Sequence, residues 1–244
     1  MAFQTVFKRY ELKYILTQEQ KEEILKAMEP YMALDGYGRT TIRNLYFDTD
    51  DYRLVRHSID KPVYKEKLRV RSYEQADSDS TVFVELKKKY ESVVYKRRIS
   101  LPEKEAMDWV NGIRHCHKDT QISREIDYFL KMYAPLKPVV YLSYEREAYY
   151  EKNGGDFRVT FDDTILCRRE ELSLQSEVYG TPLLAPGLTL MEIKCAGGIP
   201  LWMTRALSRE RIYKTSFSKY GTAYETMIFH KKQQANTSRI TEVA

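Results

Sequence analysis

Lys67-Leu68-Arg69-Val70-Arg71 alternates basic and apolar side chains. Successive side chains of a β-strand point to opposite faces. As a strand, this segment would place its three basic residues on one face and its two apolar residues on the other. An ordinary strand with a solvated charged face gives the same pattern, so the interpretation depends on whether other segments repeat it.

The composition describes a folded protein with a moderate charge. The chain has 244 residues, of which 43% are hydrophobic and 31% are charged, enough for one β-rich domain or two smaller ones. Its 20 tyrosines favour strands. The 40 basic residues are offset by 35 acidic ones, for a net charge of +5. Nucleic-acid-binding proteins usually show a stronger imbalance or a basic tail, so we expect no nucleic-acid partner.

The sequence also bears on location and domain organisation. No apolar run approaches the roughly 20 residues that cross a bilayer, and the start, MAFQTVFKRYELKY, has no signal-peptide apolar region. The 3 cysteines form no Cys-x-x-Cys pair, which fits a reducing compartment. We therefore expect a cytoplasmic protein without a membrane segment in this chain. No linker or repeat divides it, so we expect one domain over residues 1–230 and a polar tail over 231–244.

Hydrophobic periodicity predicts about eight strands with helices between pairs of them. The expected strands are 7–16, 40–48, 63–73, 81–89, 91–101, 139–151, 157–163 and 188–195. The expected helices are 17–32, 103–112, 121–133 and 216–230, another beginning at Pro200, and a short helix or turn in 50–57. A turn is expected at 35–38. This pattern predicts an α+β fold, an eight-stranded antiparallel β-barrel with peripheral helices.

Each expected strand has an apolar face and a charged face, and the helices have apolar faces that need cover. If the helices pack outside the barrel, the apolar strand faces point outward and the charged faces line a tunnel. The alternative places the charged faces in water and leaves the helices without an apolar partner. The tunnel would be lined by Arg9, Glu11, Lys13, Lys67, Arg69, Arg71, Glu85, Lys87, Lys96, Arg98, Arg146, Arg158, Glu192 and Lys194.

Such an interior has a chemical consequence. Lys and Arg outnumber the acids, and buried like charges require a counter-charge. A polyanion with several phosphates would supply it, because Arg offers a planar fork to phosphate oxygens and Lys a point charge. The carboxylates are too few to neutralise the bases. They suit a divalent cation, because Mn²⁺ and Mg²⁺ prefer carboxylate and phosphate oxygens.

Several charged pairs and short segments of the chain resemble those of a known family. The order and context of the charged pairs resemble the VTC domain, the polyphosphate polymerase domain within the triphosphate tunnel metalloenzyme superfamily. The resemblance runs over about 7–229, and includes RNLYFDT around Arg43 and YEREAY around Arg146. The pairs are Glu11-x-Lys13, Arg69-x-Arg71, Glu85-x-Lys87, Lys96-x-Arg98 and Glu192-x-Lys194, together with Arg146 and Arg158.

The resemblance implies transfer of the γ-phosphoryl group of ATP onto a polyphosphate chain, with Mn²⁺ or Mg²⁺. It implies that the catalytic phosphate contacts come from Lys13, Arg69, Arg71, Lys87, Arg146 and Arg158. It implies further phosphate binding by Arg43, Lys96, Arg98, Lys194, Lys214 and Lys219, the last two closing the tunnel. Glu192 would bind the metal, with Glu11 and Glu85 as the other candidate metal ligands.

One departure bears on the activity. The triphosphatase branch of the superfamily has an ExExK signature on its first strand, and Arg9 stands here at the first Glu position. One fewer acid favours the polymerase over a metal-rich hydrolase. Two alternatives stay open: a metal-dependent inorganic or nucleoside triphosphatase with water as acceptor, and a non-catalytic polyphosphate-binding module.

Overall fold

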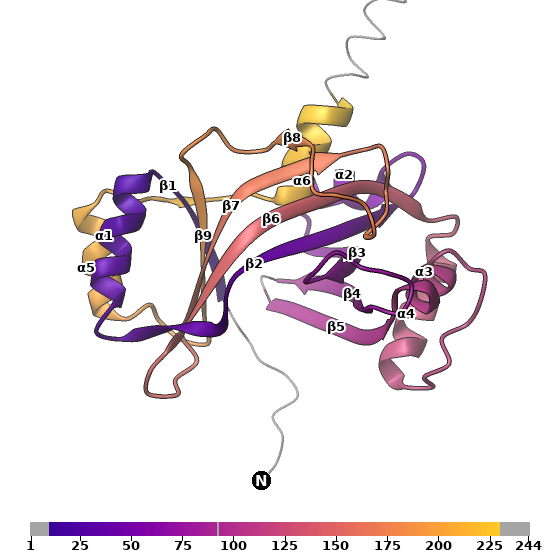
Figure 1. The fold of residues 1–244 in the computed structure, drawn as a ribbon, viewed down its shortest axis with the longest axis horizontal. Coiled ribbons are helices and arrows are strands. Elements are labelled where there is room, and N and C mark those ends of the chain that lie inside the picture. Colours follow the sequence, from indigo (N-terminus) through magenta and orange to yellow (C-terminus); the bar gives the residue numbers. More distant parts are fainter. Residues whose placement is uncertain (1–9, 92, 230–244) are drawn as a thin grey trace, which may run out of the picture.

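One strongly curled antiparallel sheet organises the chain (Figure 1). The computed structural model describes residues 10–91 and 93–229. The strands follow the order β10-β1-β9-β7-β6-β2-β3-β4-β5, and β8 pairs with β7 outside this path. Their bounds are β1 (Tyr10–Leu16), β2 (Met32–Asp48), β3 (Tyr64–Ser72), β4 (Thr81–Tyr90), β5 (Val93–Pro102), β6 (Lys137–Glu151), β7 (Arg158–Arg168), β8 (Thr181–Pro182), β9 (Thr189–Cys195) and β10 (Lys214–Thr215).

Six helices connect and cover the strands. They are α1 (Gln18–Met28), α2 (Arg53–Ile59), α3 (Glu103–Val110), α4 (Gln121–Met132), α5 (Leu201–Arg209) and α6 (Lys219–Tyr224), which a π-helical turn, Glu225–Phe229, continues. The predicted capping box of α1 is present, because Thr17 and Gln20 each accept a hydrogen bond from the other's backbone amide. Within the described ranges, every helix is too short or too polar to cross a membrane.

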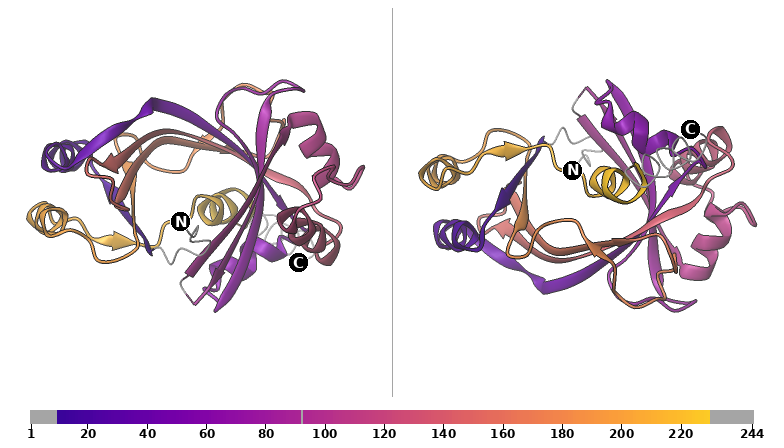
Figure 2. Two further views of the ribbon diagram at one scale, coloured as in Figure 1. Left: turned by 90° about the horizontal axis from the view of Figure 1, so that it is seen from below. Right: turned by 90° about the horizontal axis from the view of Figure 1, so that it is seen from above.

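The α+β class is confirmed, but the described residues do not form a closed eight-stranded barrel. The sheet has ten strands, two of them only two residues long. Its ends are β10 and β5, and no described residues form a ladder between them. The short β10 pairs with β1 at Lys13 and Tyr14, on the edge of β1 that closure would need. Figure 2 shows the resulting sheet curling back on itself without joining.

The outward direction of the apolar strand faces is as predicted. Ile24 of α1 and Met203 of α5 belong to one buried cluster with the outer face of β1, β7 and β9. Trp109 of α3 and Phe129 of α4 belong to another, with the outer face of β3, β4 and β5. Burial of these large side chains stabilises the fold by roughly 1.5–3 kcal/mol each. The charged faces are left on the inside of the curl.

Not every helix is peripheral, however. The inner face becomes apolar toward one end, where Ile42 of β2 and Leu142 of β6 point inward. Tyr220 and Ala223 of α6, together with Val55 of α2, pack against this part. In Figure 2, α6 lies on the concave side of the sheet rather than outside it. These helices close one end of the interior because an apolar inner surface there requires an apolar cover.

Several boundaries differ from expectation. The turn expected at 35–38 belongs to the long strand β2, which accommodates it by a register shift between Leu34 and Arg39. Helix α1 ends at Met28, because Met32 already pairs with Glu151 in the sheet. The last helix begins at Lys219 rather than at 216. The start of the first expected strand (7–9) and the expected tail (231–244) lie outside the described residues.

Candidate functional site

The inner face of the sheet encloses a cavity of about 1100 Å³. The acidic residues of its wall are Glu11, Asp35 and Glu192. The basic residues of the wall are Lys13, Lys67, Arg69, Arg71, Lys87, Lys96, Arg97, Arg98, Arg146, Arg158, Lys194 and Lys219. The wall therefore has a large excess of positive charge, as the strand pattern predicts.

Four cations surround Glu85, which is buried on β4. Arg69 Nη2 lies 2.7 Å from Glu85 Oε2, and Lys96 Nζ lies 2.6 Å from Glu85 Oε1. Arg98 and Arg71 approach the same carboxylate at 3.2 and 4.0 Å. Strand register explains part of this, since Arg69 and Arg98 stand directly beside Glu85 on the neighbouring strands. One carboxylate cannot neutralise four cations, so this cluster retains positive charge for an anion.

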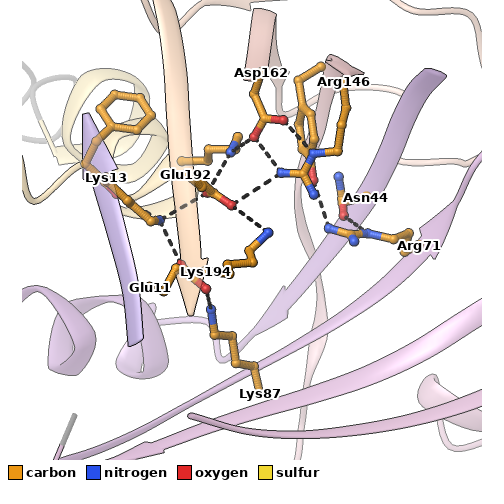
Figure 3. Close-up of polar contacts among 12 residues, drawn as sticks. Glu11, Lys13, Asn44, Arg71, Lys87, Arg146, Asp162, Glu192 and Lys194 are labelled. Atoms are coloured by element: carbon orange, nitrogen blue, oxygen red, sulfur yellow. Dashed lines mark hydrogen bonds and ion pairs between the residues drawn. The ribbon is translucent and has the colours of Figure 1, made fainter. Parts of the chain in front are cut away.

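Arg71 is held in a fixed orientation by neutral partners. Its Nε donates to Asn44 Oδ1 and its Nη2 to the Tyr144 hydroxyl, both at 2.9 Å (Figure 3). Both partners are buried, on β2 and β6. Burial would raise the pKa of Tyr144, but Arg146 and Arg71 outweigh it and lower that pKa. Such preorganisation suits a guanidinium that must meet a ligand in one geometry.

A second cluster surrounds Glu192 on β9 (Figure 3). Lys194 and Lys219 lie 3.3 Å from its carboxylate, and Lys13 and Arg146 lie 3.4 Å from it. Burial alone would raise the pKa of Glu192. The surrounding cations, Lys219 and Lys13 above all, outweigh burial and hold the pKa well below its usual value. Glu192 is therefore ionised in this site.

Asp162 on β7 is the fully buried member of this second cluster. Arg146 donates to both of its oxygens, at 2.5 and 2.6 Å. Lys219 of α6 donates to Asp162 Oδ2 at 2.5 Å. The prediction omitted Asp162, although its alternation with Arg158 and Thr160 places it on the inner face. Its partners come from two distant segments, which the local sequence does not reveal.

Three lysines stand side by side across β3, β4 and β5. Lys67 pairs in register with Lys87, and Lys87 with Lys96. Like charges directly opposite each other destabilise a sheet. Burial, with the charge of Lys87 next to it, lowers the pKa of Lys67 to about 7. Burial also lowers the pKa of Lys96 to about 8, and Glu85 only partly offsets it.

Lys67 is the least compensated of the three. Its Nζ donates to Ser218 Oγ at 3.1 Å and lies 5.8 Å from the centre of the Tyr220 ring. It forms no ion pair with any residue of the described ranges. An anion in the cavity would stabilise its charged form. No family motif singles out Lys67, yet the structure places it on the cavity wall.

Two of the three candidate metal ligands lie close together. Lys13 Nζ is 3.4 Å from Glu11 Oε1 and 3.4 Å from Glu192 Oε1, so the two carboxylates flank one point that a cation already occupies. Glu85 belongs instead to the arginine cluster on β4. No group of three metal-binding side chains occurs among the residues that the structure describes. The three candidate metal ligands are therefore divided between the two charge clusters, with Glu11 and Glu192 beside Lys13 and Glu85 among the arginines.

Two predicted phosphate ligands point away from the cavity. Arg43 stands opposite Ser143 on β6 and shares the outer face of β2 with Leu45. Lys214 is exposed and pairs with Tyr14, whose side chain packs in the outer cluster. Arg9 lies outside the described residues; the other predicted residues either line the cavity or, like Glu85, contact residues that do. Arg158 is exposed on its wall, beside Lys194.

Comparisons with known proteins agree with this architecture. The VTC domain family model matches residues 8–228. A candidate adenylate cyclase from Bacillus halodurans has 15% identity and a TM-score of 0.53, over 86% of this chain and 95% of that one. The candidate adenylyl cyclase HpAC1 from Hippeastrum, described as having a dominant triphosphatase activity, has 16% identity and a TM-score of 0.55, over 89% and 95%.

At these identities the two structures establish a shared fold. No curated protein matches the chain. The family model covers almost all of the described residues and spans both charge clusters. The chain belongs to the VTC domain family.

Proposed function

We propose that this protein is a polyphosphate polymerase, which transfers the γ-phosphoryl group of ATP to the end of a polyphosphate chain. The observation that carries the proposal is the uncompensated positive charge of the cavity wall. Four cations share Glu85, and Lys67 has no carboxylate partner among the described residues. Buried charge of this kind is stabilised by an anion with many oxygens.

The reaction needs positioning and charge stabilisation rather than a protein nucleophile. A terminal oxygen of the polyphosphate chain attacks the γ-phosphorus, and the bond from that phosphorus to the β–γ bridging oxygen breaks. ADP leaves, and the chain gains one phosphate. Arg69, Arg71 and Arg98 would hold the phosphate oxygens and stabilise the charge that develops on them. The attacking oxygen is already ionised, so no general base is required.

Glu11 and Glu192 would bind a divalent ion only when phosphate oxygens of the substrate complete its coordination. They flank one cation-binding point, and Mg²⁺ is usually held by one or two carboxylates plus phosphate oxygens. These two residues would hold Mn²⁺ or Mg²⁺ in that way. A bound ion would neutralise part of the charge on the phosphate oxygens. Lys13, which lies between the two carboxylates, would then contact phosphate instead.

Incubation of the protein with ATP and Mn²⁺ tests the proposal through its products. A polymerase yields ADP and long-chain polyphosphate, which a gel stained for polyphosphate detects. Orthophosphate without polyphosphate would identify a hydrolase with water as acceptor and overturn the proposal. Binding of polyphosphate with no turnover of ATP would identify a non-catalytic binding module and overturn it equally.

A further inference from the structure

A row of lysines continues the basic inner face beyond the cavity. Next to the row of Lys67 and Lys87, Lys65 of β3 pairs in register with Lys89 of β4. Alternate residues of a strand share a face, so Lys65 and Lys89 lie on the same side as Lys67 and Lys87. We call Lys65 and Lys89 the outer lysine row; neither of them lines the cavity itself.

The outer lysine row lacks counter-charges. Lys65 Nζ donates to the backbone oxygen of Ser58 at 2.9 Å, and neither lysine of the row forms an ion pair within the described ranges. Burial and the charges of Lys89 and Lys87 lower the pKa of Lys65. The positive potential of the cavity therefore extends along the strands to this row.

The opposite face of the same strand behaves differently. Lys88 lies between Lys87 and Lys89 in sequence and points outward, where it lies 3.9 Å from Glu66 and 3.6 Å from Glu125. The fold thus supplies carboxylates to the outward lysine and none to the two inward ones of the outer row. Solvation of a surface strand would not explain why carboxylates accompany the lysine on only one face. Binding of an anion on the inner face would explain it.

We propose that the outer lysine row binds the polyphosphate chain beyond the phosphates held in the cavity. The row continues the line of Lys67 and Lys87 along β3 and β4, and a linear polyanion is the ligand whose charges follow such a line. Lysine point charges also suit a flexible phosphate chain, which offers no fixed planar geometry. This inference rests on the proposed function, since it extends the same binding site.

The test compares tripolyphosphate with long-chain inorganic polyphosphate. In the double variant Lys65→Gln/Lys89→Gln, the affinity for long-chain polyphosphate, measured by calorimetry, should fall roughly 2- to 30-fold, the range for two partly exposed ion contacts. Its salt dependence should weaken, with the slope of log K against log[salt] reduced by roughly 0.7–0.9 for each lost contact, as for nucleic-acid phosphates. Tripolyphosphate, confined to the cavity, should bind with unchanged affinity.

Two matched variants control the experiment. Lys88→Gln removes a lysine from the same strand but from the outer face, and should leave both affinities unchanged. Lys65→Arg/Lys89→Arg keeps the charges and should retain long-chain binding, which separates lost contact from lost folding. The inference is overturned if the double Gln variant binds long-chain polyphosphate like the wild type. It is also overturned if tripolyphosphate affinity falls equally, or if only single-stranded oligonucleotide binding is affected.

These outcomes are independent of the polymerase assay. If the wild-type protein makes no polyphosphate from ATP, the proposed activity fails, but the affinity comparison still decides whether the outer lysine row binds the chain. If the protein is a polymerase and the affinities are insensitive to Lys65 and Lys89, the inference alone fails.

Discussion

Lys87 Nζ lies 3.1 Å from Glu11 Oε2, and this ion pair joins β4 to β1, two strands near opposite ends of the sheet (Figure 3). The curled sheet is thus bridged by side chains where its backbone does not close. Burial alone would raise the pKa of Glu11, but Lys87 and Lys13 outweigh it and keep the carboxylate ionised. Glu11 is therefore paired with Lys87, which an incoming phosphate would otherwise contact.

The first prediction concerns this competition. Glu11→Gln should raise the affinity for tripolyphosphate in the presence of EDTA by up to about 5-fold, because it frees Lys87 at the cost of one partly exposed ion pair. Isothermal titration calorimetry measures the change. Glu23→Gln, which removes a carboxylate of α1 that pairs with Lys26 outside the cavity wall, is the control and should have no effect. A lower affinity in Glu11→Gln would show instead that Glu11 positions Lys87 for binding.

The second prediction concerns the arginines of β3. Arg69→Ala and Arg71→Ala should each cost about 1.5–3 kcal/mol of tripolyphosphate affinity, the range for charged hydrogen bonds, which is about 10- to 150-fold in Kd. Arg124→Ala is the matched control, because Arg124 lies on α4, pairs with Asp119 and is not part of the cavity wall. The ligand-free variants should fold, since Lys96 and Arg98 still neutralise Glu85. Wild-type affinity in both variants would exclude these arginines from the site.

Strand faces could be read from the sequence because their signal is local. Residues at i and i+2 share a face whatever lies elsewhere, so the alternation in 81–89 assigned Glu85 and Lys87 correctly to the inner face. The assignment of the charged face to the inside, however, does not hold on β2. There Ile42 and Tyr46 face inward together with Asn44, so the apolar side of the strand is the inner one and Arg43 is left outside.

The helix inside the curl explains that exception. An apolar inner surface on β2 is stable only because Tyr220 of α6 packs onto it, stacking on Tyr46 with ring centres 4.6 Å apart. These residues are far apart in sequence, and no local pattern links them. Asp162 was missed for a similar reason, since Lys219 of the same helix is one of its partners. Hydrophobic periodicity could not predict these side-chain contacts, because they form between residues that are far apart in the sequence.

The third prediction concerns the stability of the ligand-free protein. Lys67 has a pKa of about 7 in the folded state and about 10.4 in an unfolded chain. Between these values the unfolded chain binds more protons, so this group makes stability rise with pH over that interval. Below pH 7, Lys67 is charged in both the folded and the unfolded chain, and its destabilising effect has its full size. Lys67→Met should therefore raise the melting temperature most at pH 7 and below, with a gain that vanishes toward pH 10, as thermal denaturation over a pH series will show.

The lowered pKa of Lys67 also predicts that the protein takes up a proton when it binds a phosphate chain. A phosphate chain favours the charged form of Lys67, so binding above pH 7 should be coupled to protonation, and affinity should fall with rising pH by up to about tenfold per unit for this one group. Calorimetry in two buffers of different ionisation enthalpy measures the uptake at pH 8. The ionisation of the phosphates themselves is common to both proteins, so the difference between wild type and Lys67→Met isolates the lysine. Equal uptake in the two proteins would contradict the assignment.

The fourth prediction separates metal-dependent turnover from anion binding. Glu192→Gln should lower the Mn²⁺-dependent turnover of ATP by about 100-fold or more, because a metal ion contributes several kcal/mol of charge stabilisation. In EDTA the same variant should bind tripolyphosphate at least as tightly as the wild type, since it loses a carboxylate that four cations now share. Thermal denaturation checks that the variant is folded. Loss of binding in EDTA would mean that Glu192 holds the lysines in place for phosphate, and wild-type turnover would mean that the metal is bound elsewhere.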